Sequence, residues 1–474
     1  MSGQVPEFRR RRTSGFQKLV DGFFKQSGLP FADTITAAMI EEVFRKHDGL
    51  FGGGAIFSTA TVLWAFLGQV LQDGKAAACQ SAVAGIIAHR QLLGLSVPTK
   101  DTGDYCRARA KLREDALHEL SCRLSENTES EADKEWLVQG RHAKLVDGFT
   151  LTMPDTEENQ REYPQAKTQK PGIGFPIARC VAIMSLATAC VMDLAIGPYS
   201  GKETGETALL RQLMSVFRPR DIAVFDRYYC TFMVIAAMLS GGTDVCCRKH
   251  HLRKSDFRRG KRLGKYDHLI AWTRPKKPKW MDKQTYQNIP KQILLREIKL
   301  VIAQPGFRSK NFVVITTLID PVEFSQEVIA ELYGFRWNVE LDIRSIKSNL
   351  NLEHVRCKSP AMVRRELWTT ILAYNLIRST AAASAILHHV KPRQISFTST
   401  VQFVLQEWKQ LAKGNLSPEI LKAFIETMLH AIAQCSVADR PERVEPRVVK
   451  RRPKPYKKMM KPRAQLKREL TNPQ

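Results

Sequence analysis

The sequence of 474 residues predicts a mixed α/β protein whose layer of strands is interrupted by a basic insertion. Three observations support this fold class. Short runs rich in Val, Ile and Thr alternate with helical patterns between residues 144 and 242. A basic segment broken by Pro and Gly follows, and a strand and helix pattern resumes at residue 311. Because a chain of this length exceeds one ordinary core, we expect two or three domains.

Residues 1–140 are expected to form a helical N-terminal domain with a DNA-binding or accessory role. Apolar residues recur at helical spacing in ITAAMIEEVFRKH, ATVLWAFLGQVL and SAVAGIIAHRQLLG. The run from Gly49 to Gln72 is uncharged and long enough to cross a bilayer. It contains three consecutive Gly and several Ser, Thr and Gln residues, so we expect a loop and a buried helix, with no membrane partner.

The next hundred residues combine strands with helices. Strands are expected where β-branched and apolar residues cluster, at 144–153, 179–188, 190–199 and 221–226. The second and third of these strands are joined closely enough to form a hairpin. Helices are expected at 204–217 and 230–242, and Gly residues end the second one.

Residues from about 243 to 310 form the predicted insertion. Between residues 243 and 283 the chain holds 14 Lys and Arg against four Asp, which favours contact with DNA. The motif CCRKHH at 246–251 lacks the spacers of closed zinc sites, so we do not predict zinc there. Trp272 is either a core residue of this segment or an aromatic platform for an unstacked base.

The remaining chain is expected to be largely helical and to end in a basic tail. A strand at 311–320 precedes long helical patterns at 321–350 and 359–389, and a helical segment is expected at 391–439. Residues 440–474 hold 13 Lys and Arg against three Glu and are rich in Pro. This composition predicts an extended or disordered tail.

The net charge of +26 indicates which class of molecule the protein binds. So positive a protein favours a polyanion, and nucleic acid is the most common one. Ten Cys residues without a repeating spacing indicate reduced thiols in a cytosolic protein rather than a disulfide framework. No apolar run follows the charged N terminus, so no signal peptide is predicted.

One helical stretch carries four polar residues on a single narrow face: Tyr333, Arg336, Glu340 and Lys347. At 100° per residue they fall within about 60° of one another, beside an apolar stripe. They therefore lie on the shoulder of a buried face, where a cleft can form. The alternative is an amphipathic helix with an ordinary Arg336–Glu340 pair. Asp342 falls about 160° away from Glu340 on the same helix.

Two further acids belong to the predicted strands. Asp147 lies inside the first strand, and Asp226 ends the last one before the insertion. Ligands of open α/β sheets gather at the carboxyl ends of strands. With Glu340, these acids could hold two Mg²⁺ ions about 4 Å apart, which activate water against a phosphodiester. As alternatives, Asp147 could be an ordinary edge-strand acid and Asp226 a helix cap. Asp155 is a rival to Asp147, but it follows Pro in a turn-like segment.

These residues resemble the Asp-Asp-Glu triad of the DDE transposases. The pattern Tyr333-x2-Arg336-x3-Glu340-x6-Lys347 is similar to the Y-R-E-K signature of the IS-four family of insertion sequences. The segments DGFTLTMPDTEEN and VFDRYY are similar to the two Asp motifs of that family. The two Asp are 79 residues apart, and the Glu follows 114 residues later, which fits a family with a β-rich insertion before the Glu.

The resemblance covers roughly residues 140–390 and implies an RNase H-like catalytic core over residues 141–390. It implies that Asp147, Asp226 and Glu340 are catalytic and bind two Mg²⁺ ions, with Mn²⁺ as a possible substitute. Residues expected to contact DNA are Tyr333, Arg336, Lys347, Arg227 and Trp272.

The resemblance predicts a transposase that binds the terminal repeats of its element, cleaves phosphodiester bonds there and joins the freed 3′-OH ends to target DNA. Double-stranded DNA is the implied partner, a homodimer is the implied synaptic form, and the cytoplasm is the expected location, at the nucleoid in a bacterium. Two alternatives stay open. One is a catalytically silent DNA-binding protein derived from a transposase, and the other is an RNase H-like nuclease without strand transfer.

Overall fold

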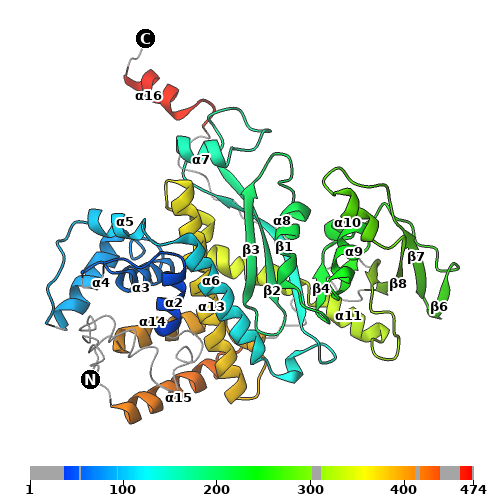
Figure 1. Ribbon diagram of the computed structural model, residues 1–474. Helices are drawn as coiled ribbons and strands as arrows, with labels where there is room; N and C mark the ends of the chain where they lie inside the picture. Colours follow the sequence, from blue (N-terminus) through cyan, green and yellow to red (C-terminus); the bar gives the residue numbers. More distant parts are fainter. Residues whose placement is uncertain are drawn as a thin grey trace, which may run out of the picture. The chain divides into compact units, whose positions relative to one another are not determined.

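The computed structural model describes residues 37–52, 55–92, 94–301, 311–411, 417–437 and 459–471. The predicted mixed α/β class is confirmed, with many helices and a nine-stranded sheet (Figure 1). The chain divides into two compact units, and neither is continuous in sequence. The first unit comprises Met1–Asn127, Leu367–His389 and Ile395–Cys435, and the second comprises Thr128–Glu366, Val390–Gln394 and Ser436–Gln474.

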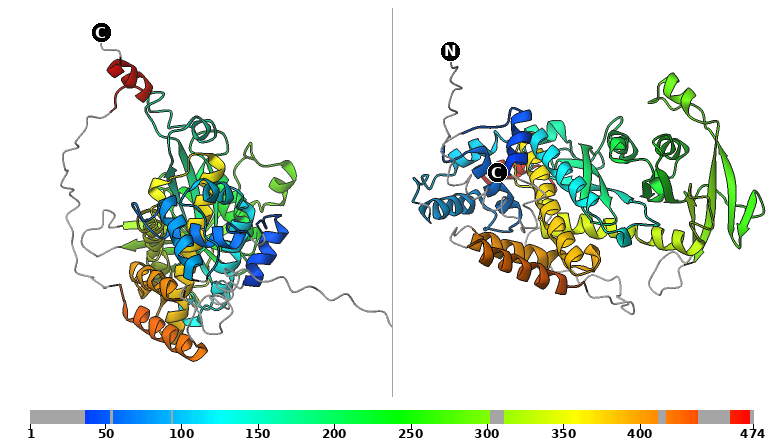
Figure 2. Two further views of the ribbon diagram at one scale, coloured as in Figure 1. Left: turned by 90° about the vertical axis from the view of Figure 1, so that its left-hand side faces the viewer. Right: turned by 60° about the horizontal axis from the view of Figure 1, so that its bottom comes forward.

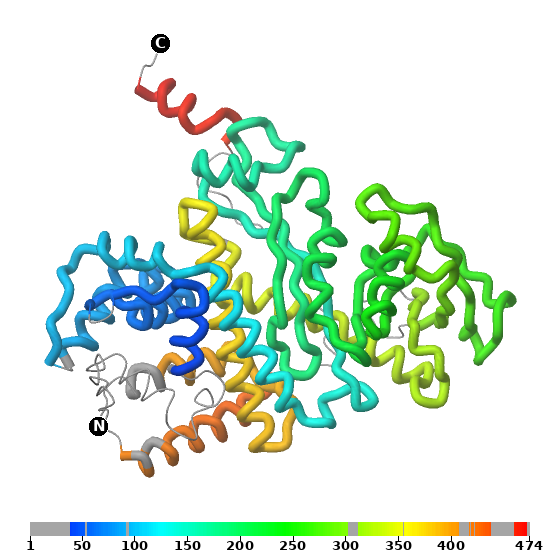
Figure 3. The backbone as a smooth tube through the Cα atoms, in the orientation of Figure 1, coloured from blue at the N-terminus to red at the C-terminus, as the bar shows by residue number. Residues whose placement is uncertain are grey.

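The first unit is helical. Its helices are α2 (Ala37–Lys46), α3 (Thr59–Val70), α4 (Cys79–Leu92), α5 (Gly103–Arg109), most of α6 (Glu114–Ser130) and of α13 (Pro360–Leu387), α14 (Phe397–Leu411) and α15 (Pro418–Gln434). Helices α3, α4 and α5 pack on one another, and α14 packs on α15 (Figure 3). In the described part of the chain, α13 has the length and composition to cross a membrane, but 83% of its most apolar stretch is buried, as in the core helix of a globular protein.

The second unit is built on the sheet, whose strand order is β3-β2-β1-β4-β5-β9-β8-β7-β6. The strands are β1 (Ala143–Thr152), β2 (Ile177–Ser185), β3 (Val191–Pro198), β4 (Ile222–Phe225), β5 (Asp244–Arg248), β6 (Lys261–Gly264), β7 (Asp267–Thr273), β8 (Gln292–Val301) and β9 (Asn311–Thr316). The predicted hairpin is confirmed, because β2 pairs antiparallel with β3. Strand β2 also pairs antiparallel with β1. The pairs β1–β4 and β4–β5 are parallel, and the pairs beyond β5 are antiparallel.

Helices cover both faces of the first five strands. On one face, α8 (Glu206–Gln212) and α9 (Phe232–Ser240) share a hydrophobic cluster with Val146 and Phe225. On the other face, α12 (Trp337–Arg344) packs against β1 and α11 (Gln326–Gly334) against β5. This division follows from strand geometry, because Asp147 points opposite to Val146 and contacts Arg336 at the start of α12. Shorter helices of this unit include α7 (Glu157–Glu162), α10 (Lys283–Asn288) and α16 (Arg463–Thr471).

The insertion predicted at 243–310 begins with a strand of the central sheet. Strand β5 pairs with β4 and β9, and its residues Cys246 and Cys247 are fully buried. The extension of the sheet consists of β8, β7 and β6, which continue from β9 away from the first five strands (Figure 2). Composition alone does not predict strand β5, because many basic residues follow it directly in the sequence.

Two other segments differ from expectation. The single helical unit predicted at 321–350 is divided into α11, α12 and a π-helical turn, η4 (Ser345–Asn349). Within the predicted disordered tail, α16 forms a helix, and the Glu469 carboxylate accepts from Lys461 and Gln465 there. These local contacts stabilise a short helix in spite of the Pro-rich composition. The tail residues 440–458 and 472–474 lie outside the described residues.

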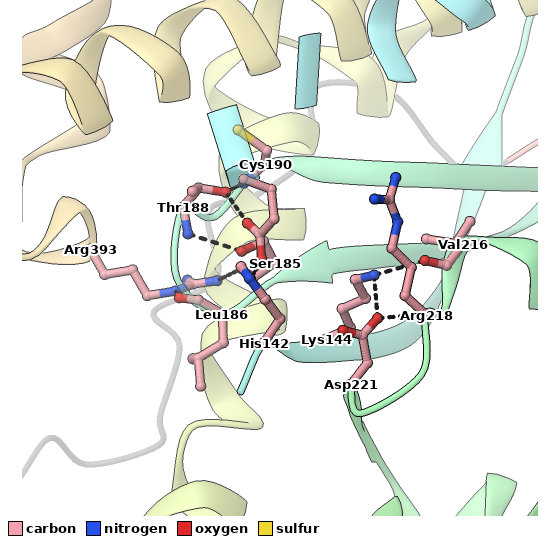
Figure 4. A network of polar contacts seen from close by, with 11 residues as sticks. His142, Lys144, Ser185, Leu186, Thr188, Cys190, Val216, Arg218, Asp221 and Arg393 are labelled. Carbon is pink, nitrogen blue, oxygen red and sulfur yellow. Dashed lines mark hydrogen bonds and ion pairs between the residues drawn. The ribbon is translucent and has the colours of Figure 1, made fainter. Parts of the chain in front are cut away.

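A buried polar network anchors the amino ends of β1 and β4 (Figure 4). Lys144 Nζ lies 2.6 Å from the Asp221 carboxylate and also donates to a backbone carbonyl. On the neighbouring β2 and the turn after it, Arg393 donates to the backbone oxygens of Ser185 and Leu186. Because these bonds satisfy the buried charges, they hold this end of the sheet in place. Away from this end, Asp147 lies in the middle of β1, and Asp226 directly follows the carboxyl end of β4.

Candidate active site

The parallel pairing of β1 with β4 brings two of the predicted acids together. Val146 pairs with Phe225 in the parallel ladder, so Asp147 and Asp226 are the next residues of neighbouring strands. Adjacent strands lie about 5 Å apart. Among the described residues, β1 pairs with β4 only as far as Val146, because β4 ends at Phe225. The two strands therefore part at the two acids, and we call this place, where the β1–β4 pairing ends, the open edge.

Each of these two acids is held by a backbone donor. Asp147 accepts a hydrogen bond from the Gly148 N–H at 2.8 Å. Asp226 accepts from the Arg227 N–H at 2.6 Å and caps the short helix η3 (Arg227–Tyr229). The helix-cap alternative for Asp226 is therefore observed, and the same residue also lies at the open edge. The backbone bonds fix the direction in which each carboxylate points.

Arg336 joins the third acid to the first. Its Nη2 donates to Glu340 Oε1 at 2.8 Å, and its Nη1 lies 3.7 Å from Asp147 Oδ2. The Arg336 side chain is buried, whereas the Glu340 side chain is partly exposed. The four-residue pair that the sequence leaves as an alternative is present. Arg336 of this pair also lies near Asp147, so the polar face of the helix is turned toward the acid of β1.

Burial and several neighbouring groups act on the carboxyl group of Asp147. Burial raises the pKa of Asp147 to about 6; the Gly148 N–H and Arg336 oppose this rise, and the carboxylates of Glu340 and Glu206 add to it. Hard divalent cations bind carboxylate oxygens, which Asp147, Asp226 and Glu340 supply. The residues at the open edge therefore fit a Mg²⁺ site.

The other residues expected to contact DNA differ in exposure. Arg227 is exposed next to Asp226. Lys347 on η4 is half-buried and acts electrostatically on Cys180 of β2. Tyr333 is only 7% exposed, and burial raises the pKa of its hydroxyl. Tyr333 therefore packs beneath the site, while Arg227 is open to solvent.

Trp272 lies in the core instead of forming an open platform. Its side chain is 8% exposed and belongs to the hydrophobic cluster that also contains Ile293. The guanidinium carbon of Arg253 lies 4.0 Å from the centroid of the Trp272 ring. A base could stack on this ring only after Arg253 had moved. The core-residue alternative therefore describes the position of Trp272.

Comparison with known proteins identifies the family. Residues 139–376, about half of the chain, match the model of the transposase DDE domain. The chain belongs to the DDE transposases. This transposase is 28% identical over 326 residues to the transposase InsG for insertion sequence element IS4 of Escherichia coli strain K12, which covers 66% of this chain and 68% of that protein. The resemblance predicted from the motifs is confirmed, and the protein is a transposase of an insertion element.

Two further similarities accompany these matches. The transposase for insertion sequence element IS421 of Escherichia coli is 30% identical over 77 residues, which covers 16% of this transposase and 21% of that one. Among solved structures, the piggyBac transposase synaptic complex with hairpin DNA aligns with a TM-score of 0.44 at 10% identity. That alignment covers 89% of this chain and 86% of the other.

One acid of this transposase site is absent from the sequence-based prediction. Glu206 is the first residue of α8, and its carboxylate acts on Asp147. In the sequence it stands in TGETALL, where an acid in the first turn of a helix is unremarkable. Glu206 could have been predicted from strand direction, because it follows β3, which runs in the same direction as β1 and β4.

The raised pKa of Asp147 predicts pH-dependent metal binding by the transposase. Below about pH 6 its carboxyl group holds a proton, which must leave before the group can bind a cation. The apparent affinity for Mn²⁺ should therefore fall by about tenfold for each pH unit below 6 and level off above about pH 7. Calorimetry in two buffers of different ionisation enthalpy measures the affinity and the protons released.

The same shift has the opposite consequence for stability without metal. The folded pKa of Asp147 exceeds its ordinary value of 3.8, so the protonated form favours the folded state. This contribution is present below pH 3.8 and is lost as the pH rises through about 6.

Asp155→Asn, at an exposed position, is the control, and it should leave the pH dependence of metal affinity and of stability unchanged. An Mn²⁺ affinity that stays constant between about pH 5 and pH 7 would contradict the assignment to Asp147.

Proposed function

We propose that the transposase binds the terminal repeats of its element, cleaves phosphodiester bonds there and joins the freed 3′-OH ends to target DNA. The observation that carries this proposal is the meeting of Asp147, Asp226 and Glu340 around one open sheet edge, with Arg336 contacting two of them. Carboxylates that converge in this way suit metal-dependent phosphoryl chemistry. The family of the chain supports the same reaction class.

An RNase H-like core over residues 141–390 is part of the proposal. It is supported by the order β3-β2-β1-β4-β5, in which three antiparallel strands continue into two parallel ones. In this reading β6, β7 and β8 are the β-rich insertion between the second Asp and the Glu. The helical segments at 1–140 and 391–439 are proposed to be accessory, and the basic tail at 440–474 to bind DNA.

The three acids are proposed to hold two Mg²⁺ ions, for which Mn²⁺ could substitute. Their hard carboxylate oxygens fit such ions. Bound Mg²⁺ supplies activation of the attacking water or 3′-OH and stabilises the charge on the leaving oxygen. Asp147 must lose its proton first, and the Gly148 N–H bond favours that charged form.

The cations at the site are proposed to position the scissile phosphate. Arg336 is paired with Glu340 and lies near Asp147. When these carboxylates bind a cation, the guanidinium of Arg336 becomes available to hold a phosphate with two parallel hydrogen bonds. Lys347 and the exposed Arg227 contribute further positive charge. A phosphate held in line with the attacking oxygen is what this chemistry requires.

Double-stranded DNA and a second copy of this chain are the proposed partners. The net charge of +26 supports binding to the terminal repeats and to target DNA. A homodimer would hold two element ends together, one at each site. The proposed location is the cytoplasm, at the nucleoid if the host is a bacterium.

The decisive experiment is incubation with DNA that carries the element's own ends and Mg²⁺, followed by strand-resolved gel analysis. The proposal requires a cut at the element end and a joined product in the same reaction. End binding without any cut would favour the catalytically silent DNA-binding alternative. Cuts without a joined product would favour the nuclease alternative.

The basic tail should make DNA affinity steeply dependent on salt. Each phosphate that a Lys or Arg neutralises releases counterions, so the logarithm of affinity falls linearly with the logarithm of salt concentration. Deleting residues 440–474, which hold 13 Lys and Arg, should make this slope shallower. Fluorescence anisotropy at several salt concentrations measures it. A variant with Gln in place of the Lys and Arg residues of 450–458 is the matched control for length. An unchanged slope in both would show that the tail does not touch phosphate.

A further inference from the structure

A fourth carboxylate, that of Glu206, stands at the same sheet edge as the predicted acids. Strands β1 and β3 run in the same direction, because each is antiparallel to β2. The chain leaves β3 at Pro198 and enters α8 at Glu206, so α8 begins near the carboxyl end of β1. The Glu206 carboxylate is close enough to Asp147 to act on it electrostatically.

Gly148 leaves open the space that this carboxylate occupies. A Cβ atom at position 148 would lie 2.5 Å from Cδ of Glu206 and 2.7 Å from its Oε1. No carbon atom fits at such distances, so any larger residue would push the carboxylate away. The φ angle of Gly148 lies outside the left-handed region, so space and not backbone conformation explains the glycine. The residue after Asp147 is therefore small because Glu206 approaches there.

Tyr229 is a second, independent observation. Its side chain is fully buried, and its hydroxyl has no hydrogen-bond partner of normal geometry among the described residues. The Glu206 carboxylate lies at the margin of hydrogen-bonding distance from this hydroxyl, and Asp147 also acts on it electrostatically. A buried hydroxyl without a partner is costly. It is explained if the hydroxyl, which already faces the Glu206 carboxylate, completes its hydrogen bond when that carboxylate binds a cation.

We propose that Glu206 is a fourth ligand of the divalent cation site, beside Asp147, admitted by Gly148 and oriented by Tyr229. This inference rests on the proposed function, because it adds a ligand to the site formed by Asp147, Asp226 and Glu340. Four carboxylates suit a site for hard cations, which prefer many oxygen ligands. The competing explanation is structural: an acid in the first turn of α8 interacts favourably with the helix N terminus and need not touch a metal.

Calorimetric titration of the full-length protein with Mn²⁺ alone separates the two explanations. Glu206→Gln should lower the affinity by at least about tenfold without changing the Tm. Gly148→Ala should have a similar effect, because its Cβ displaces the Glu206 carboxylate. Tyr229→Phe should lower the affinity about threefold while the Tm stays equal or rises, since it removes an unpaired buried hydroxyl. Glu203→Gln is the matched control, because Glu203 is exposed and paired with Arg211.

Each outcome distinguishes this inference from the proposed function. Wild-type affinity of Glu206→Gln with a lowered Tm would assign Glu206 to helix stabilisation and overturn the inference. Asp226→Asn is titrated in parallel: if it loses affinity while Glu206→Gln does not, only the inference fails. If both bind Mn²⁺ like the wild type, the proposed function fails as well. Should Glu206→Gln not fold, the affinities of Gly148→Ala and Tyr229→Phe decide the question.

Discussion

Asp226→Asn should slow cleavage at the element ends by at least about a thousandfold, a loss of roughly 4 kcal/mol of transition-state stabilisation. Asp147→Asn and Glu340→Gln should do the same, because each amide keeps the shape of the side chain but removes a charged oxygen ligand. Joining should be lost together with cleavage. Binding of the end DNA should be retained, because contacts to phosphate supply most of that affinity. Single-turnover cleavage assays with Mg²⁺ and gel-shift titrations measure the two quantities.

Asp342 provides the matched control on the same helix as Glu340. The helical spacing predicts that Asp342 faces away from Glu340 and that Asp342→Asn is mild. The structure refines this expectation, because the Asp342 side chain is buried and lies 2.8 Å from Arg393. Asp342→Asn should therefore lower the free energy of unfolding while leaving cleavage per folded molecule within a few-fold. If Asp342→Asn abolished cleavage and Glu340→Gln did not, the assignment of the third acid would be wrong.

The second large effect is expected at Asp267, whose loss should destabilise the fold by about 3–5 kcal/mol. Both oxygens of Asp267 accept from Arg296, at 2.9 Å and 2.6 Å, and both side chains are buried. Arg296 also donates to the backbone oxygen of Phe324. This cluster joins β7 and β8 to the segment before α11. Asp267→Asn leaves the buried guanidinium without its counter-charge, and urea denaturation measures the change.

Two variants test whether that effect belongs to the buried pair. Replacing both partners together, Asp267→Leu with Arg296→Met, should recover most of the lost stability, because no unpaired charge remains. Asp256→Asn removes an acid from an exposed pair with Arg258 and should leave the free energy of unfolding unchanged. If Asp267→Asn destabilised no more than Asp256→Asn, the buried pair would have no special role in stability.

Residue patterns in the sequence indicate the positions of the three acids along the chain. Asp147 and Asp226 are suggested by their positions in and after short apolar strands, and Glu340 by its helical spacing from Arg336. The parallel pairing of β1 with β4 places the first two side by side. The contact of Arg336 with both Glu340 and Asp147 brings the third to the same edge. Local periodicity could assign Asp147 and Glu340 to regular elements and place Asp226 just after a strand. The pairing of β1 with β4 and the approach of Arg336 to Asp147 are tertiary contacts, which periodicity does not contain.

Burial is where the sequence-based prediction falls short. Trp272 and Tyr333 look like available aromatic side chains in the sequence, yet both are buried. Strand β5 is hidden by the basic residues that follow it, and Glu206 resembles an ordinary acid at a helix start. In each case the deciding contact comes from a distant segment, such as Arg253 over Trp272 or Glu206 beside Gly148. Spacing along the chain carries no information about such contacts.

The sequence by itself determined the mixed α/β class, the positive charge that points to DNA, and the motifs that identify a DDE transposase of the insertion-sequence type. These properties depend on composition and on short-range periodicity, which are complete in the linear chain. Only the tertiary structure decided that Arg336 pairs with Glu340 and approaches Asp147, that β4 stops opposite Val146 to leave an open edge, and that Glu206 lies beside Gly148. These distances follow from how strands and helices far apart in sequence pair and pack, since a side chain's neighbours are set by the fold.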